Sequence, residues 1–286
     1  MKICNEIKII REITGLSQAD LAKALNVSRL SIINWENGNV EVEENNIEVV
    51  YEFAYKNKIY LNRLYEMNYI EKIKSEINYV IFHGAKGTLQ MPLDLDHSKA
   101  RNDFGKGVYF GEELYQAGTF ISEHENGRVY IFEINMLDLN IVRFKVSKEW
   151  MIAVAYYRGL LDNYSNHKVI KNIIKKVEDA DLIIAPIADN KMYNIINQFV
   201  LGEITDEQCS HALSATDLGN QYVVRTKKAL EKMYLLKECY VSKSEMKEYD
   251  NIRSKISDLG LKKVKLARIE YKGKGKYIDE VLSWEN

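Results

Sequence analysis

Apolar residues in the first 37 positions recur at the spacing of short amphipathic helices. Isoleucines at positions 3, 7, 10 and 13 predict a first helix, and Gly15 is suited to end it. Ser17 and Ser28 are good N-caps for two more helices, one over residues 18–25 and one that ends near Trp35. Asn26 suits the tight left-handed turn between them, so the pattern predicts a helix-turn-helix.

The helical pattern continues after this motif. Apolar residues recur at helical spacing from Ile47 to Leu64 and extend the bundle. Residues 68–77 are charged and predict a helical connector. We therefore expect a first, all-helical domain over residues 1–67.

From residue 78 the pattern changes to short apolar runs bounded by glycine and polar residues. Such runs are typical of buried strands, and they lie near residues 78–85, 107–110, 128–136, 139–146 and 182–186. Helical patterns fall at residues 148–161, 192–202, 205–213 and 226–236. This irregular mixture predicts an α+β domain over residues 78–240.

The last segment, residues 241–286, is predicted to be an extension of the second domain. Residues 242–258 predict an amphipathic helix, and residues 262–276 contain seven Lys or Arg against one Glu. The sequence YKGKGKY near its end predicts a solvated turn. The basic stretch is interpreted either as a solvated tail or as an arm that docks a nucleic acid or another target.

Length and composition support a multidomain globular protein. The chain has 286 residues, 46% hydrophobic and 28% charged, with a formal net charge of −1. No apolar run is long enough for a membrane span, and charges interrupt the first residues where a signal peptide would be apolar. The three cysteines lie far apart, which argues against a disulfide framework and a metal site. We expect a cytoplasmic protein without a metal.

The segment GLSQADLAKALNVSRLSIINWENG resembles the DNA-binding module of the lambda-repressor and Xre class of bacterial regulators. The resemblance implies that the third helix faces a major groove. The residues expected to contact DNA are Gln18, Ser28, Arg29, Ser31 and Asn34. Residues 1–66 hold eight basic and ten acidic residues, so non-specific phosphate attraction should be weak. A protein-interaction or dimerisation role is the alternative.

Two short motifs in the second domain could carry chemistry. Phe82-His83-Gly84 ends a strand, and glycine there allows a close approach of the backbone to a flat ligand. Residues 103–110, with the sequence DFGKGVYF, open the next strand and precede a helix that contains Phe120. Each motif alone is a weak signal. The chain contains neither a Walker loop nor a dinucleotide-binding glycine fingerprint in a suitable context.

Together, in this order and spacing, the motifs resemble the NAD-binding site of ADP-ribosyltransferases of the diphtheria-toxin and poly(ADP-ribose) polymerase branch. Later segments, DLIIAPIADNKMYNIINQFVLGEIT and NQYVVRTKKAL, resemble the bacterial family DUF3990, which belongs to that clan. The resemblance covers roughly residues 78–236. It implies an ADP-ribosyltransferase fold of two split antiparallel sheets with a nicotinamide cleft between them.

The resemblance assigns expected roles to five residues. His83 would hydrogen-bond the 2′-hydroxyl of the nicotinamide ribose, and the Gly84 backbone would pair with the carboxamide. Tyr109 would stack on the nicotinamide ring, and Phe120 stands where the branch has a second tyrosine. Arg101 is a candidate for contact with the pyrophosphate.

The third motif departs from the pattern, because Gln221 stands where the family has a catalytic glutamate. A carboxylate there stabilises the oxocarbenium-like transition state, and an amide can orient the ribose but supplies no charge. Asp103, Asp189 and Glu203 are candidate substitutes, of which Asp189 is favoured because it follows a buried strand and belongs to the bacterial pattern.

The resemblance implies an NAD-dependent mono-ADP-ribosyltransferase with a fused DNA-binding module. NAD would be the substrate, a protein or nucleic acid the acceptor, and the biological role that of a toxin-like or phage-defence effector. An antitoxin or a second copy of the chain are conceivable partners. One alternative is a transcriptional regulator whose degenerate domain senses NAD or ADP-ribose. A weaker alternative is an RNA 2′-phosphotransferase on the same fold.

Overall fold

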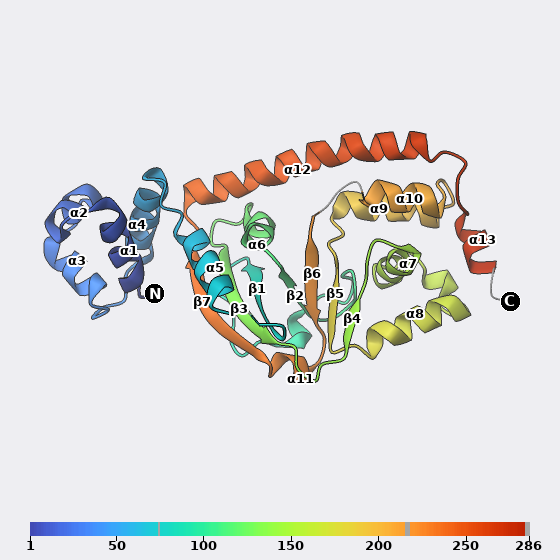
Figure 1. Cartoon of the computed structure of the whole chain (residues 1–286), viewed down its shortest axis with the longest axis horizontal. Coiled ribbons are helices and arrows are strands. Elements are labelled where there is room, and N and C mark those ends of the chain that lie inside the picture. The colour runs from blue at the N-terminus through green and yellow to red at the C-terminus, as the bar shows by residue number, and fades with distance from the viewer. Residues whose placement is uncertain (74, 215–217, 284–286) are drawn as a thin grey trace.

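The computed structural model describes residues 1–73, 75–214 and 218–283 (Figure 1). Its N-terminal part is a helical bundle, as expected. The helices are α1 (Cys4–Thr14), α2 (Gln18–Leu25), α3 (Arg29–Glu36), α4 (Glu44–Lys56) and α5 (Leu61–Lys72). The Ser17 and Ser28 side chains accept hydrogen bonds from the backbone of their helices, and Asn26 is left-handed with φ 55°. The predicted helix-turn-helix is therefore confirmed.

The core of the bundle is built from the apolar stripe that the sequence shows. Ile3, Ile7 and Ile10 are fully buried against α2, α3 and α4. Tyr240, from the second domain, belongs to the same cluster. The bundle therefore shares part of its core with the rest of the chain.

The second domain contains one seven-stranded mixed sheet. Its strands are β1 (Asn78–Ala85), β2 (Val108–Gly111), β3 (Arg128–Asn135), β4 (Ile141–Arg143), β5 (Leu182–Pro186), β6 (Asn220–Val224) and β7 (Met233–Tyr240). They lie in the order β4-β5-β6-β2-β1-β3-β7. The β4–β5 pair is parallel, and the other neighbours are antiparallel.

This sheet corrects the expectation of two separate antiparallel sheets. The strands form one continuous sheet, although the seam between β1 and β2 is a single register pair, Phe82 with Gly111. The expected helix over residues 226–236 is also wrong in its second half. Helix α11 (Lys227–Leu230) ends early, and Met233 begins strand β7, because pairing with β3 outweighs local helix preference.

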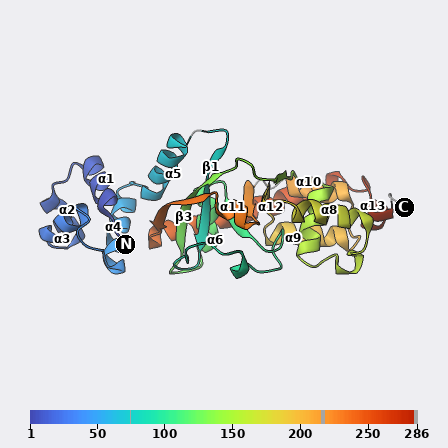
Figure 2. The ribbon, with the colours of Figure 1, turned by 90° about the horizontal axis from the view of Figure 1, so that it is seen from below.

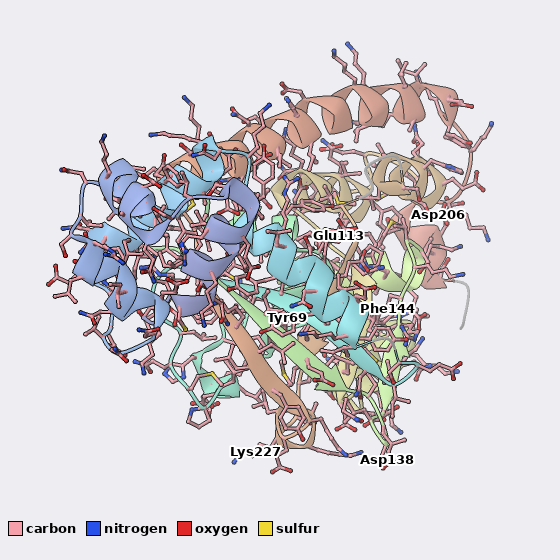
Figure 3. All side chains as sticks on the ribbon, turned by 60° about the vertical axis from the view of Figure 1, so that its left-hand side comes forward. Tyr69, Glu113, Asp138, Phe144, Asp206 and Lys227 are labelled. Atoms are coloured by element: carbon pink, nitrogen blue, oxygen red, sulfur yellow. The ribbon has the colours of Figure 1, made fainter. Side chains whose placement is uncertain are left out.

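Helices cover the sheet unevenly (Figure 1). Helices α7 (Lys148–Tyr157), α8 (Lys168–Glu178), α9 (Asn190–Val200) and α10 (Asp206–Ser214) form a large core with β4, β5 and β6. Helix α6 (Leu114–Ile121) packs between β1 and the long C-terminal helix. The α5 helix crosses in front of β3 and β7 in Figure 3, and there the Tyr69 hydroxyl donates to the Leu236 carbonyl at 3.2 Å.

Helix α12 (Lys243–Glu270) runs along much of the molecule, from the first bundle to the far helices (Figures 1 and 2). The expected end at residue 258 was too early, because the helix continues along α10, where Ala267 is buried. Helix α13 (Ile278–Ser283) follows.

The YKGKGKY segment forms an exposed turn over residues 272–275, as expected, and hydrogen bonds to the start of α10 also hold it in place. Asp206 donates from its backbone N–H to the Lys276 carbonyl at 2.9 Å, and its side chain accepts from the Lys276 N–H at 2.7 Å. Gly275 is left-handed, and a Cβ there would collide with the Asp206 carboxylate. The loop is therefore packed against the start of α10.

Candidate functional site

His83 lies at the seam where β1 and β2 stop pairing. Its Nδ1 lies 2.8 Å from the carbonyl oxygen of Tyr109, which can only accept. Nδ1 must therefore carry the proton, and Nε2 is left as an acceptor with no partner among the described residues. Burial lowers the pKa of His83, which favours the neutral ring in which Nε2 is an acceptor.

Close packing of α6 against β1 explains why the His-Gly motif has a glycine at position 84. A Cβ on Gly84 would lie 2.5 Å from the Ala117 carbonyl oxygen of α6 and 3.1 Å from Ile121. Only glycine lets α6 approach β1 so closely. The expected contact of its backbone with a carboxamide stays a prediction.

Tyr109 uses its hydroxyl to fix the loop that precedes β2. The hydroxyl donates to the Gly105 carbonyl at 2.7 Å and accepts from the Phe104 N–H at 3.2 Å. Burial raises the pKa of Tyr109, so the phenol stays protonated. Phe120 differs, because its side chain is 60% exposed on α6 and its ring is open to a ligand.

Gln221 is held in a buried polar cluster. Its Nε2 donates to Asp103 Oδ2 at 2.8 Å and to the Pro186 carbonyl at 3.0 Å. Gln221 is 6% exposed and Asp103 is 5% exposed. Arg158 neutralises the carboxylate, with Nη2 2.5 Å and Nε 2.7 Å from Asp103 Oδ1. Asp103 is thus the carboxylate that the structure brings to Gln221.

The favoured substitute carboxylate, Asp189, has a different role. Its side chain caps α9 by accepting from the N–H groups of Lys191 and Met192 at 3.0 and 2.8 Å. Glu203 is exposed after α9. Arg101 is also exposed, with Nη2 3.6 Å from an Asp162 carboxylate oxygen. Asp189, Glu203 and Arg101 lie outside the hydrogen-bonded cluster around Gln221.

The sheet register relates His83 to Gln221. Phe82 and Gln221 both align with Gly111, so their side chains share one face. His83 follows Phe82, so its side chain lies on the opposite face, where its ring centroid is 5.3 Å from that of Phe110, and its Nδ1 reaches the Tyr109 backbone carbonyl at the seam. The structure therefore places Tyr109 and Gln221, with Asp103 bonded to Gln221, on one face of the sheet, and the His83 ring on the other face.

Sequence reasoning missed Arg158 and Arg225. Arg225 donates to the Phe104 carbonyl and its guanidinium lies 5.7 Å from the Tyr157 ring centroid. The sequence signal for Arg158 was a charged residue directly after the apolar stretch 148–157. In the structure its Nη2 donates to the Ala188 carbonyl, just before α9. Arg158 thus ties the loop around Asp103 to the end of α7, and Arg225 ties it to the end of β6.

The expected DNA-contacting residues divide into two groups. Ser28 and Ser31 hydrogen-bond each other, with their hydroxyl oxygens 2.8 Å apart. Gln18 donates to Glu36 at 2.7 Å. Arg29 is exposed and Asn34 half-buried on α3, and neither side chain has a hydrogen-bond or ion-pair partner among the described residues. Arg29 and Asn34 are thus the members of the set that are free to meet a base.

Four glutamates of the bundle have partners outside it, in the second domain or at the start of α12. Glu6 pairs with Lys237 at 2.5 Å, and Glu44 pairs with Arg128. Glu48 accepts from the Tyr240 hydroxyl at 2.7 Å, and Glu52 accepts from the Ser244 N–H and hydroxyl. Without these four, the eight basic residues of positions 1–66 outnumber the remaining six acidic ones. Four of the ten acidic residues that argued against phosphate attraction are therefore paired at this contact, although the Glu44 side chain stays 61% exposed.

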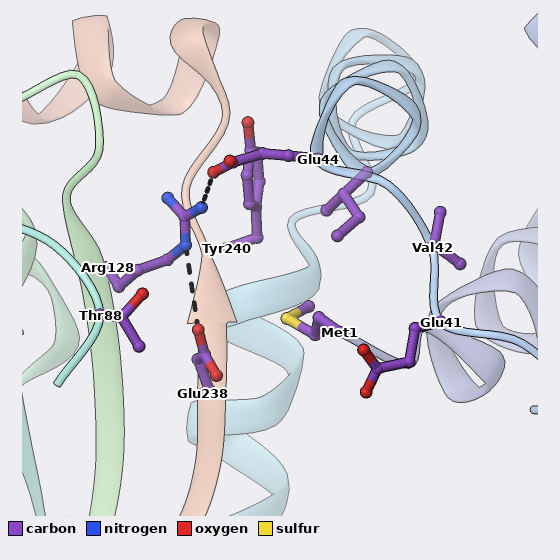
Figure 4. A pocket seen from close by; sticks show the side chains of 9 residues that line it. Met1, Glu41, Val42, Glu44, Thr88, Arg128, Glu238 and Tyr240 are labelled. Atoms are coloured by element: carbon purple, nitrogen blue, oxygen red, sulfur yellow. Dashed lines mark hydrogen bonds and ion pairs between the residues drawn. The ribbon is translucent and has the colours of Figure 1, made fainter. Parts of the chain in front are cut away.

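A cavity of about 390 Å³ opens at the same contact (Figure 4). Arg128 lies beside it, with its guanidinium 4.5 Å from the Tyr240 ring centroid and Nε 3.9 Å from Glu238. The cavity is lined by Met1, Glu41, Val42, Glu44, Ile47, Thr88, Arg128, Glu238 and Tyr240. None of the residues expected to bind NAD lines it.

Fold and motifs together define a helix-turn-helix of the DNA-binding type fused to a mixed α/β domain. The comparisons with known proteins agree. A helix-turn-helix family model matches residues 7–47. The family described as protein of unknown function (DUF3990) matches residues 79–235, more than half of the chain, so the chain belongs to this family. No curated protein and no solved structure matches significantly.

Membrane spans and metal clusters are both absent from the part of the chain that the structure describes. No helix there is both long and apolar enough to cross a membrane. No group of three or more His, Cys, Asp or Glu side chains within residues 1–73, 75–214 and 218–283 is arranged to hold a metal ion.

Proposed function

We propose that this protein is an NAD-dependent mono-ADP-ribosyltransferase whose helix-turn-helix binds DNA. The observation that carries the proposal is His83, held as a neutral ring at the β1–β2 seam with Nε2 unpartnered among the described residues. An acceptor nitrogen of this kind suits a ribose hydroxyl. The exposed Phe120 ring offers a flat surface for nicotinamide, so the residues present fit NAD as a substrate.

The seam also supports the finer assignment of the fold. An ADP-ribosyltransferase fold has two half-sheets with a cleft between them; here the strands form one sheet, in which β1 and β2 share a single register pair, Phe82 with Gly111, and the His83–Tyr109 hydrogen bond. The three motif strands β1, β2 and β6 are consecutive neighbours in the sheet. This arrangement supports a nicotinamide site at the seam.

In the proposed reaction the bond between nicotinamide and ribose breaks, and an acceptor nucleophile forms the new bond to the ribose. His83 would orient the ribose through Nε2, and the ring of Phe120 would place the nicotinamide. Gln221 supplies no charge, so activation of an acceptor hydroxyl for polymer growth is not expected. Transfer of a single unit to an intracellular protein or nucleic acid fits this set of residues.

The test is incubation of the full chain with NAD labelled in its adenosine half. Nicotinamide release and label in a macromolecular fraction support the proposal. His83→Ala should abolish both, whereas His97→Ala, on an exposed turn, should leave both unchanged. If the protein acts as a toxin-like or phage-defence effector, its expression should slow bacterial growth and His83→Ala should relieve the effect.

A second candidate is a regulator that senses NAD or ADP-ribose without turnover. The geometry of Gln221 favours it, because the amide is fixed among acceptors and Arg158 already neutralises the nearby Asp103. Saturable NAD binding without nicotinamide release would select this function.

A further inference from the structure

The surroundings of Gln221 are specific for an amide. Asp103 Oδ2 and the Pro186 carbonyl are both acceptors, and both receive hydrogen bonds from the same nitrogen, Nε2. The two contacts thus assign the amide orientation, since the reverse orientation would set an oxygen against two oxygens. Gln221 is therefore held by two donated hydrogen bonds, which an ionised glutamate could not make and a protonated one could make only in part.

The other end of the amide points elsewhere. Oε1 of Gln221 accepts no hydrogen bond from the residues that the structure describes. It is also absent from the fully buried polar atoms that lack a partner within the described chain, so it keeps a contact with solvent. A ligand hydroxyl or amide can donate to this oxygen.

Asp103 itself is fixed from three sides. Arg158 binds Oδ1 through two nitrogens, and Oδ2 accepts from Gln221 and, at 3.4 Å, from the Ala188 N–H. Arg158 is held in turn by the Ala188 carbonyl at 3.1 Å and by the Tyr193 ring. The carboxylate therefore has one possible position relative to the amide.

We propose that Asp103, with Arg158, is a positioning residue that fixes the Gln221 amide so that its carbonyl oxygen is presented to NAD. This assignment rests on the proposed function and deepens it. A glutamate at position 221 would restore the carboxylate of the family, but here it would place two buried carboxylates about one hydrogen-bond length apart.

The experiment is a double-mutant cycle in the full chain, with NAD affinity, nicotinamide release and the thermal midpoint as readouts. Asp103→Asn should weaken NAD binding about ten-fold, because the Gln221 amide is then free to turn its donor toward the ligand. Gln221→Glu should weaken binding further. The double variant should recover most of that loss, since the new amide at position 103 can donate to the new carboxylate at position 221.

Asp206→Asn is the matched control. Asp206 is also 5% exposed and paired with a cation, Lys148, but lies at α10. Its replacement should lower the thermal midpoint and leave NAD affinity unchanged. If Asp103→Asn binds NAD as tightly as the wild type, or if the double variant shows no recovery, the positioning role of Asp103 is overturned and the proposed function is not. A wild-type protein that does not bind millimolar NAD overturns the proposed function, and this assignment with it.

Discussion

Glu6 of α1 and Lys237 of β7 form a buried ion pair that joins the DNA-binding bundle to the sheet, with Nζ 2.5 Å from Oε1. The Tyr51 hydroxyl donates to the same carboxylate at 3.3 Å, and the Lys237 ammonium lies 4.6 Å from the Tyr65 ring centroid. Two residues 231 positions apart thus meet inside one core. The bundle is part of the folded body rather than a tethered module.

Removing one partner of this pair should be costly. Lys237→Met leaves the Glu6 carboxylate, whose side chain is 1% exposed, without its cation, and should lower the free energy of unfolding by about 3–5 kcal/mol. Glu6→Gln combined with Lys237→Met should recover much of that stability. Chemical denaturation measures both. Glu123→Gln, which breaks an exposed pair with Arg253, should cost less than about 1 kcal/mol, and a similar cost for both sites would contradict the argument.

DNA recognition should depend on α3. Replacing Arg29 and Asn34 together with alanine should remove selective binding to the protein's own promoter fragment, at about 1–3 kcal/mol for each base that is no longer recognised. NAD binding should be unaffected because the two sites lie far apart in the fold. Electrophoretic mobility shifts at two salt concentrations measure the effect. If the wild type prefers no promoter fragment, the helix-turn-helix serves as an interaction module.

Phe120 separates ligand binding from stability. Phe120→Ala should change the free energy of unfolding by less than about 0.5 kcal/mol, because the side chain is 60% exposed. It should nevertheless weaken NAD binding if the ring stacks on nicotinamide. Phe120→Tyr should retain binding. Calorimetric titration with NAD measures the affinity of each variant. Unchanged affinity in Phe120→Ala would show that this residue is not part of the NAD site.

The lowered pKa of His83 predicts a pH dependence of stability. The unfolded chain takes up a proton near the ordinary value of 6.5, whereas the folded ring does so only at lower pH. Stability should therefore fall as the pH drops below about 6.5 and level off below the folded pKa. His83→Gln should remove this part of the dependence. Denaturation curves of the wild type and His83→Gln at pH 7.5 and 5.5 provide the check. If the free energy of unfolding changes equally with pH in the two proteins, the His83 ring lies in solvent.

Local signals predicted the local structure well. Ser17, Ser28 and Asn26 act within one turn of their own helices, so the helix-turn-helix could be drawn from sequence. The β7 strand could not, because the run near Met233 has a helical pattern and becomes a strand only by pairing with β3. The end of α12 was misplaced for a similar reason, since burial against α10 decides it.

The candidate site also has a part that short motifs predict and a part that depends on contacts between distant residues. The positions of His83 and Tyr109 follow from short motifs, and their hydrogen bond joins adjacent strands. The contact between Asp103 and Gln221 spans 118 positions and depends on a loop whose course no local pattern fixes. Sequence therefore favoured Asp189, which lies near the cluster but caps a helix.

The start of α12 depends on residues that are synthesised much earlier. Glu48 accepts from the Lys243 N–H at 3.1 Å and Glu52 from the Ser244 N–H, so the first turn of the last long helix is completed by the bundle. At about 5–20 residues per second, the ribosome releases the bundle roughly 10–40 s before that helix emerges. During this interval Glu48 and Glu52 of the nascent bundle lack the α12 partners that they have in the finished protein. Comparison of DNA affinity between the full chain and a chain stopped at residue 240, which lacks Lys243 and Ser244, would measure how Glu48 and Glu52 act on DNA before the last helix forms.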